Sequence, residues 1–476
     1  MNSSLAVLQT RFLMLGVSLI ALSQQIFGAD KRPNVLLILS DDHSAPYLGC
    51  YGNPDLKTPN LDKLANEGVL FTRAYVTAPQ SVPSRASLMT GRSVVDVDML
   101  RFTAPLDKQF ITFPELLRKQ GYYTGLCGRS YHLDGDGNTS GSSYKYLVDY
   151  KLMTFSSRFD YVHTGNDDET ISQFEEFLNQ PRGNKPFFMQ AGFNDPHRSF
   201  TAPEYEPNPD SLTIPSGMPD TKLLRKDLSG HYGEIQRLDL RIGKLLNVLK
   251  KKAILDNTII IFMGDNGAAL LRGKGTLYEH GIHVPLIMRF PKTIKAGTTT
   301  DALISGEDIG PTVLDMVRIK PDPKMTGKSF FSVIEGDKKD IREYAFAVRG
   351  THASILPGSS VSFDLSRCVI SKKFKFIYNP MFNLPYCPVD FESEDFWKEL
   401  VQLNKDKKLP ERFSQTYMFS SQRPMFELYD LENDPNEFIN LSGKKEFEHQ
   451  EKTMKTELLK WMILNRDVVP LPITTN

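Results

Sequence analysis

Two short clusters along the chain carry side chains that could bind a metal ion. Asp41 and Asp42 follow one aliphatic run, and Asp265 and Asn266 follow another. Two adjacent carboxylates at the end of a buried strand lose hydration and repel each other, unless a cation lies between them. Three carboxylates and an amide oxygen form an all-oxygen ligand set, which hard divalent cations prefer, calcium above all. The alternative is a solvated turn, in which Asp41 caps the next segment.

Groups that bind anions or transfer protons stand in other clusters. Arg85, Arg129 and Lys274 carry positive charge, and His132 and His197 carry imidazoles. Together these side chains would suit a tetrahedral oxyanion. With a metal ion beside them, they could hold a sulfate or phosphate ester and stabilise charge as it moves to the leaving oxygen.

The stretch 81–92, SVPSRASLMTGR, contains the candidate nucleophile. We expect Ser81 to become the nucleophile, Arg85 to hold it in place, and residues 89–92 to shape the backbone under them. Taken alone, the stretch could equally be an ordinary turn that enters a helix, with Pro83 in the first turn and a serine as a local hydrogen-bond donor.

Several aliphatic runs have the composition of strands that are buried on both faces. Each run ends at a polar cluster, and helical patterns alternate with the runs. The runs are 34–39, 122–127, 186–192 and 258–263. This alternation predicts an α/β fold with a mostly parallel sheet. Because ligands bind beyond the carboxyl ends of such strands, we expect the clusters to meet on one rim.

The remaining patterns complete the expected elements and divide the chain. The length suggests about two domains. We expect a catalytic domain at 30–339 and a smaller C-terminal α+β subdomain at 340–476, where the pattern changes to short strands. Helices are expected from Pro59 to Gly68 and at 114–120, 227–252, 311–317 and about 446–465; strands are expected at 69–76, 286–290, 344–348, 367–370 and 374–378, and from Glu427.

Residues 1–29 have the pattern of a secretory signal peptide. Arg11 precedes the apolar run 12–22, and small residues follow at 28–29. The run is too short to span a bilayer comfortably, so we expect a cleaved signal, no membrane span and a periplasmic or secreted protein. A buried N-terminal helix is the alternative. Lys+Arg and Asp+Glu both number 57, and no basic stretch interleaved with aromatics occurs, so nucleic acid is not an expected partner.

Four cysteines allow three pairings, and the sequence cannot choose among them. Cys368 and Cys387 form the plausible pair, because both lie in the C-terminal part. Cys127 stands in an apolar run and is expected to be a small buried hydrophobe. The cysteines lack zinc-ligand spacing, and no Cys-x-x-Cys occurs.

The chain resembles the formylglycine-dependent sulfatases of the alkaline phosphatase superfamily over about residues 32–441. The resemblance rests on a specific motif, Ser-x-Pro-Ser-Arg at 81–85 with Thr-Gly-Arg at 90–92. Other motifs follow in the expected order: 33–42 (PNVLLILSDD), 121–124 (GYYT), 196–197 (PH), 265–267 (DNG), 274–279 (KGTLYE), 427–430 (ELYD) and 434–437 (DPNE).

This resemblance implies a mostly parallel mixed sheet sandwiched by helices, as in alkaline phosphatase. It also implies that a dedicated maturation enzyme oxidises Ser81 to formylglycine (3-oxoalanine), here of the serine type, while most relatives have cysteine. The hydrate of formylglycine would attack sulfur with one hydroxyl and release sulfate when a base takes the proton of the other. Calcium would be bound by Asp41, Asp42, Asp265, Asn266 and the modified Ser81.

The family also implies roles for the surrounding side chains. Arg85 would steady the aldehyde hydrate and Lys274 would grip the sulfate. His132 would act on the hydrate hydroxyl, and His197 would protonate the leaving oxygen, since a sugar alkoxide leaves poorly.

Three positions depart from the family pattern. Arg129 replaces a common lysine and, as an arginine, can clamp anionic oxygens but cannot donate a proton at working pH. His283 stands where many relatives have arginine, and Arg198-Ser199 changes the loop after His197. His280 and His283 remain open as substrate contacts. The other histidines are expected at the surface or in packing; they are His43, His163, His231, His352 and His449.

The expected substrate is a sulfated polysaccharide or glycosaminoglycan fragment, as the family and the export signal suggest. Two alternatives stay open. The same framework serves phosphodiesterases and phosphonate monoester hydrolases, and a relative that binds glycans without turnover would carry the same fold.

Overall fold

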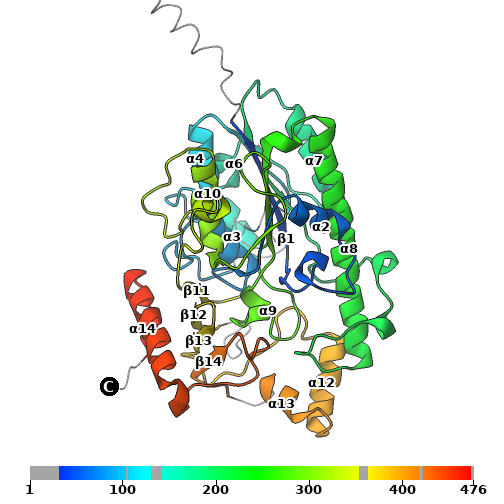
Figure 1. Ribbon diagram of the computed structural model, residues 1–476, viewed down its shortest axis with the longest axis vertical. Helices are drawn as coiled ribbons and strands as arrows, with labels where there is room; N and C mark the ends of the chain where they lie inside the picture. Colours follow the sequence, from blue (N-terminus) through cyan, green and yellow to red (C-terminus); the bar gives the residue numbers. More distant parts are fainter. Residues whose placement is uncertain are drawn as a thin grey trace, which may run out of the picture.

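An eight-stranded sheet forms the centre of the protein (Figure 1). The computed structural model describes residues 32–472 except 103–104, 130–131, 133–141, 353–362 and 418–421, so the expected signal peptide lies outside the described residues. In spatial order the strands are β5 (Tyr161–Val162), β4 (Tyr123–Gly128), β6 (Phe187–Gly192), β1 (Asn34–Ser40), β7 (Thr258–Gly264), β8 (Leu286–Arg289), β2 (Val69–Phe71) and β9 (Thr298–Thr300).

Only β8 runs against its neighbours among these strands; the other adjacent pairs are parallel. The central strands are buried on both faces, because helices cover the sheet on both sides. In β1, Val35, Leu37 and Leu39 enter one core and Leu36 and Ile38 enter the other. The predicted α/β fold with a mostly parallel mixed sheet is confirmed.

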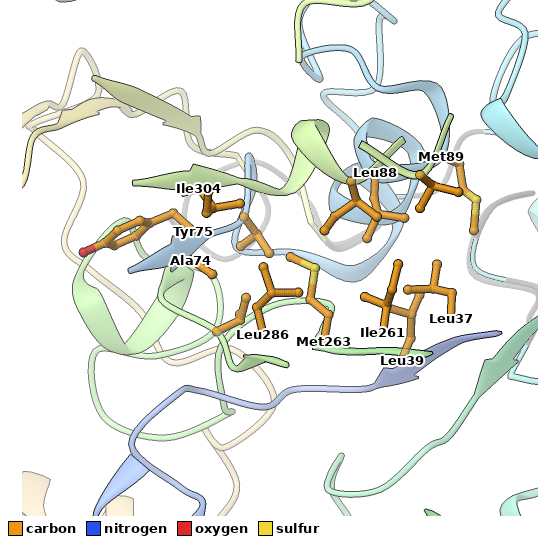
Figure 2. Close-up of a cluster of buried hydrophobic side chains, with 14 of the residues drawn as sticks. Leu37, Leu39, Ala74, Tyr75, Leu88, Met89, Ile261, Met263, Leu286 and Ile304 are labelled. Atoms are coloured by element: carbon orange, nitrogen blue, oxygen red, sulfur yellow. The ribbon is translucent and has the colours of Figure 1, made fainter. Parts of the chain in front are cut away.

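One face of the sheet carries α3 (Ser81–Thr90), α4 (Phe113–Lys119) and α10 (Ile309–Met316), as Figure 1 shows. Helix α3 is fixed to the sheet by Leu88 and Met89, which are buried above strands β1 and β7. Figure 2 shows these two side chains facing Leu37, Leu39, Ile261 and Met263.

The other face carries α2 (Pro59–Asn66), α7 (Asp167–Asn179) and α8 (Lys222–Lys251). Helix α8 buries the predicted apolar stripe, which includes Ile235, Leu238 and Leu245. It begins five residues before the predicted start, because the Thr221 side chain accepts a hydrogen bond from the Leu224 amide and caps the helix.

A second, antiparallel sheet consists of β11 (Ala345–Val348), β12 (Arg367–Ile370), β13 (Phe374–Tyr378) and β14 (Phe426–Asp430). Helix α14 (Glu448–Leu464) packs on it, and Trp461 stacks on Phe346 with ring centroids 5.1 Å apart. Helix α12 (Asp395–Lys405) instead packs against α8 through Phe396 and Leu400. The domain boundary at 339/340 stays a prediction.

Smaller elements connect these layers. They are α5 (Ser142–Asp149), α6 (Phe155–Arg158), α9 (Glu279–Ile282), α11 (Phe331–Ile334), α13 (Glu411–Thr416) and the parallel pair β3 (Ala74–Tyr75) and β10 (Ile304–Ser305). The strand expected at 69–76 is therefore divided into β2 and β3, which belong to different sheets. In the described residues no helix is long and apolar enough to cross a membrane.

The expected Cys368–Cys387 pairing is wrong, since no disulfide bond joins these two cysteines. Cys368 lies in β12 with its side chain in the core beneath the large sheet, whereas Cys387 is half-buried in a loop beside Pro385. Cys127 is buried in β4, as expected.

Candidate active site

The polar clusters meet at one edge of the large sheet. Strands β4, β6, β1 and β7 are consecutive in space, and their carboxyl ends lead to Arg129, His197, Asp41 and Asp265. One polar cluster at the end of a strand could be an ordinary turn. Four such clusters at the ends of four adjacent strands instead indicate a binding site at this edge.

Helix α3 brings Ser81 to this edge. Ser81 is the first residue of the helix, after the N-cap Gln80, and it is fully buried. Its hydroxyl lies 2.9 Å from Oδ1 of Asn266 and 3.2 Å from Oδ1 of Asp41. The stretch 81–92 is thus both a helix entry and part of the polar centre. Gly91 ends the helix in a left-handed conformation with φ 63°.

Arg85 lies one helical turn after Ser81, on the same side of α3. Its Nε donates to Oδ2 of Asp265 at 2.8 Å, and Nη2 donates to Oδ2 of Asp41 at 3.0 Å. Its Nη1 also donates to the carbonyl of Arg129 at 3.3 Å. One buried guanidinium therefore fixes the ends of β1, β4 and β7 relative to one another.

The carboxylates of Asp41, Asp42 and Asp265 are buried, with at most 1% of each residue exposed. Nδ2 of Asn266 donates to Oδ1 of Asp42 at 2.8 Å, and the Asp42 amide donates to Oδ1 of Asp265 at 3.1 Å. Asp42 has φ 59°, a left-handed conformation that turns the chain sharply after β1.

The electrostatics of these carboxylates differ. Burial, partly offset by Lys274, raises the pKa of Asp42 to about 7, and burial with Asp41 nearby raises the pKa of Asp265 to about 6. Burial also disfavours the charge of Asp41, but Arg129 and Arg85 outweigh it and hold the pKa of Asp41 well below its usual range. Asp42 and Asp265 therefore carry a charge that the protein's own cations leave partly uncompensated.

This donor set fits a hard divalent cation. Oxygens of the three carboxylates, of the Asn266 amide and of the Ser81 hydroxyl converge within one buried centre. One oxygen each from Asp41 and Asp42 lies within 4.8 Å of a nitrogen of His197, and Asp41 and Asp265 make a similar group with His132. A cation here would favour the charged forms of Asp42 and Asp265 and so offset the burial that raises their pKa values.

Arg129 and His132 lie on one side of Asp41. Nε of Arg129 is 2.6 Å from Oδ2 of Asp41, and Nη2 of Arg129 is 3.1 Å from Nε2 of His132. Because guanidinium only donates, Nε2 of His132 accepts, and Nδ1, 3.5 Å from Oδ2 of Asp41, carries the proton. Burial and the Arg129 charge lower the pKa of His132 well below its usual value, so this imidazole is neutral.

Lys274 and His197 lie next to Asp42. Nζ of Lys274 donates to Oδ2 of Asp42 at 3.0 Å and lies 3.2 Å from Nε2 of His197. Burial and the Lys274 charge lower the pKa of His197 to about 4. Burial disfavours the charge of Lys274, but Asp42 and Asp390 outweigh it and raise the pKa of Lys274 above its usual range.

Sequence reasoning missed one residue of this site, Asp390. Its Oδ2 accepts a hydrogen bond from Nζ of Lys274 at 2.5 Å and lies 3.7 Å from Nε2 of His197. Asp390 stands in an irregular segment before α12, where neither periodicity nor a motif marked it. A Pro-Val-Asp-Phe sequence in a loop carries no signal that distinguishes this carboxylate from a solvated one.

The two histidines left open lie in other surroundings. Nδ1 of His283 is 3.3 Å from Oε2 of Glu279, and its Nε2 is 2.9 Å from the Thr72 carbonyl. Nδ1 of His280 is 3.4 Å from the hydroxyl of Tyr47. Both belong to a cleft of about 570 Å³ that does not include the Ser81 centre among its lining residues.

Of the other histidines, His43 is buried against the Tyr47 carbonyl at 3.0 Å, His163 stacks on Tyr161, and His231 packs edge-on against Tyr47. His352 packs against Phe102 with ring centroids 4.7 Å apart and lies 3.3 Å from Nε2 of Gln80, the N-cap of α3.

Comparisons with known proteins agree with this geometry. The family model described as "Sulfatase" matches residues 33–319. An ulvan-active sulfatase of Formosa agariphila is 29% identical over 482 residues, which cover 93% of this chain and 76% of the relative.

Two solved structures share the fold. One is a protein in complex with its substrate D-glucosamine-2-N,6-O-disulfate, with a TM-score of 0.68, 22% identity and coverage of 93% of this chain and 100% of the other. The phosphonate monoester hydrolase of Agrobacterium radiobacter has a TM-score of 0.70, 22% identity and coverage of 91% and 96%. The family match spans more than half of the chain and contains every site residue named above except Asp390 and His352. The protein therefore belongs to the sulfatase family of enzymes, which hydrolyse sulfate esters.

Proposed function

We propose that this sulfatase hydrolyses sulfate esters of carbohydrates, in polysaccharide or glycosaminoglycan fragments, outside the cytoplasm. The observation that carries the proposal is the position of Ser81, whose hydroxyl faces Asp41 and Asn266 at the centre of the site. The carbohydrate substrate is supported by the ulvan-active relative and by the sugar disulfate bound in a structure of the same fold.

Two groups complete the proposed site. Calcium would be held by Asp41, Asp42, Asp265, Asn266 and residue 81, and Ser81 would be oxidised to formylglycine by a separate maturation enzyme. When present, calcium supplies positive charge against the sulfate oxygens, and formylglycine supplies a hydrate hydroxyl as the nucleophile.

The charge of the site is consistent with a bound dication and a monoanionic ester. The side chains in direct contact include four carboxylates and three permanent cations, a net excess of one negative charge. A divalent ion reverses this excess to one positive charge, which a sulfate monoester neutralises. The groups are Asp41, Asp42, Asp265 and Asp390 with Arg85, Arg129 and Lys274.

The cationic side chains bind and position the substrate. Arg129 pairs with Asp41 and Lys274 pairs with Asp42, and both cations would contact the sulfate oxygens. Arg129 remains charged at any working pH, so it acts as a clamp and not as an acid. Arg85 keeps Asp41 and Asp265 in register and is positioned to steady residue 81.

The two imidazoles move protons. His132 is neutral, and its one lone pair, on Nε2, accepts a hydrogen bond from Arg129. When Arg129 turns to the sulfate oxygens, Nε2 would take a proton from the residue-81 hydroxyl group. His197 would give a proton from Nε2 to the leaving oxygen. A bound sulfate ester stabilises the imidazolium of His197, because a nearby negative charge raises the pKa of an imidazole.

Export follows from the predicted signal peptide at residues 1–29. The mature protein is expected to start near residue 30, and sequencing of the N-terminus of the secreted or periplasmic protein tests this expectation.

The decisive experiment combines a mass measurement with an activity comparison. The tryptic peptide 74–85 from protein produced with a serine-type maturation enzyme should be lighter by two hydrogens than the encoded peptide. The matured protein should cleave 4-nitrophenyl sulfate faster than 4-nitrophenyl phosphate, and should release sulfate from at least one member of a set of 2-, 3-, 4- and 6-O-sulfated glucosamines and galactoses.

Other outcomes identify the alternatives. An unmodified peptide together with a preference for phosphate or phosphonate esters would favour a phosphoesterase. Calcium binding and sugar binding without turnover of any ester by the oxidised protein would favour a glycan-binding relative.

A further inference from the structure

Asp390 is a fourth carboxylate at the rim, and it differs from the other three. Asp41, Asp42 and Asp265 are buried, whereas the Asp390 side chain keeps 33% of its surface exposed. Its Oδ2 contacts Lys274, while part of its side-chain surface stays in contact with solvent. A carboxylate can accept about four hydrogen bonds, so the partly exposed Asp390 can accept a hydrogen bond from a substrate in addition to that from Lys274.

The backbone holds Asp390 in this place by a conformation that few aspartates adopt. Asp390 has φ 66°, in the left-handed region. The preceding Val389 is buried against Gly275, which itself has φ 80°, and a Cβ atom at position 275 would stand only 2.4 Å from Val389. This close approach joins the Asp390 segment to the Lys274 loop, so the carboxylate and the ammonium are positioned together.

Distances to His197 place Asp390 beside the proposed general acid. Nε2 of His197 is 3.6 Å from Oδ2 of Asp42 and 3.7 Å from Oδ2 of Asp390. Under the proposed function, this nitrogen faces the oxygen that leaves as sulfate is transferred. The nearest groups of the sugar, the hydroxyls next to the ester, then fall within reach of the Asp390 carboxylate.

We propose that Asp390 is a specificity-determining residue, which accepts a hydrogen bond from a sugar hydroxyl next to the scissile sulfate ester and disfavours sugars that carry a second anionic group there. The inference rests on the proposed function and adds the class of substrate, a sugar whose hydroxyl next to the cleaved ester is free. An anionic neighbour would meet a negative carboxylate at the mouth of a largely desolvated site, and its repulsion would not be relieved by Lys274, which is shared between Asp42 and Asp390.

The test compares Asp390→Asn and Asp390→Ala with wild-type enzyme on two kinds of ester. On the best monosulfated sugar of the set above, each variant should lose about 10- to 100-fold in kcat/KM, the contribution of a hydrogen bond to a charged group. On 4-nitrophenyl sulfate, which has no hydroxyl next to the ester, the loss should be several-fold smaller than on the sugar, because only the contact with Lys274 is changed. Asp395→Asn is the matched control, because this exposed aspartate in the first turn of α12 loses the same charge five residues away.

Changes in the substrate test whether Asp390 contacts the hydroxyl next to the ester. The deoxy sugar that lacks the neighbouring hydroxyl should be a poorer substrate of the wild type, and Asp390→Asn should cause little further loss on it. The same sugar with a second sulfate at that position should be rejected by the wild type and accepted several-fold better by Asp390→Asn. Calorimetric binding of the monosulfated sugar to the Ser81→Ala variant, with and without Asp390→Asn, provides a readout apart from turnover.

Equal losses on the aryl ester and on the sugar ester would overturn the proposal, because they would mean that Asp390 only holds Lys274 in place. Unchanged discrimination between the mono- and disulfated sugars would also overturn it. If matured wild-type enzyme cleaves none of the esters, the proposed function itself fails, and this is recognised from the wild type alone.

Discussion

The Ser81 hydroxyl lies 2.9 Å from Oδ1 of Asn266, although 185 positions separate the two residues in the chain. The contact exists because α3 begins at the same edge of the sheet where β7 ends. Asn266 also donates to Asp42, so a single amide connects residue 81 to the carboxylates. Any change in the position of α3 on the sheet therefore moves the candidate nucleophile relative to the proposed metal ligands.

Removal of the metal should destabilise the protein and abolish its activity. A ligand that binds only the folded state raises the free energy of unfolding, so EGTA should lower the melting temperature by several degrees, and excess calcium should restore it. Differential scanning fluorimetry and 4-nitrophenyl sulfate hydrolysis measure the two effects. Asp265→Asn should weaken the calcium response, whereas Asp395→Asn should leave it unchanged. A melting temperature that changes with neither EGTA nor calcium would contradict the proposed calcium site.

Calcium should bind more weakly as the pH falls. Burial raises the pKa of Asp42 to about 7 and of Asp265 to about 6 in the metal-free protein, so protons compete with the ion. A raised carboxyl pKa stabilises the metal-free fold below about pH 4, and this contribution is lost as pH rises through 6 and 7. The rise in melting temperature caused by calcium should therefore be larger at pH 8 than at pH 5.5. A rise that is constant across this range would be inconsistent with proton competition.

Replacement of Arg85 by alanine should destabilise the fold strongly. Arg85 is 1% exposed, and it pairs with Asp41 and Asp265, which would lose a buried partner. Breaking such a pair costs about 3–5 kcal/mol. Chemical denaturation in the presence of EGTA measures the change. Lys398→Ala removes an exposed pair with Asp395 and should have little effect. Similar stabilities for the two variants would refute the structural role of Arg85.

Loss of His197 should matter most for substrates with poor leaving groups. His197→Ala should reduce kcat/KM on a sulfated sugar by about 10²- to 10⁴-fold, the usual contribution of a general acid. The loss on 4-nitrophenyl sulfate should be much smaller, because 4-nitrophenolate leaves without protonation. Steady-state kinetics on both esters make the comparison, and an equal loss on both would assign His197 to binding.

The contact beneath α3 should contribute several kcal/mol. Leu88→Ala removes a side chain that is 2% exposed above β1 and β7 and should lower the free energy of unfolding by about 2–5 kcal/mol. Leu464→Ala is the control, since this leucine is 74% exposed. Urea titration compares the two. Equal losses of stability in the two variants would contradict the prediction that Leu88 stabilises the packing of α3 on the sheet.

The sequence predicted the strands best where both faces are buried. The runs at β1 and β7 are aliphatic throughout, so their ends could be located to within a residue, and with them the polar clusters that follow. The order of strands in the sheet was not encoded in any local pattern. Only the general rule about the carboxyl ends of parallel strands indicated that the clusters share one edge.

Other features depend on contacts that no local pattern contains. The strand expected at 69–76 is interrupted because the chain changes sheets at Thr72 and Arg73. The pairing of Cys368 and Cys387 failed because proximity in sequence says nothing of the side to which a strand residue points. Asp390 could not be predicted as a site residue, because it joins the site through a contact with Lys274, more than a hundred positions earlier, and through a backbone conformation with φ 66°.

The complete burial of Ser81 has a consequence for the order of its proposed oxidation and of folding. An enzyme that oxidises this side chain has no access to it once α3 has settled on the sheet. The proposed oxidation of Ser81 would therefore have to come before folding, and a chain that folds first would keep its serine. The yield of active enzyme would then depend on how fast the maturation enzyme acts relative to folding of the chain in the producing cell.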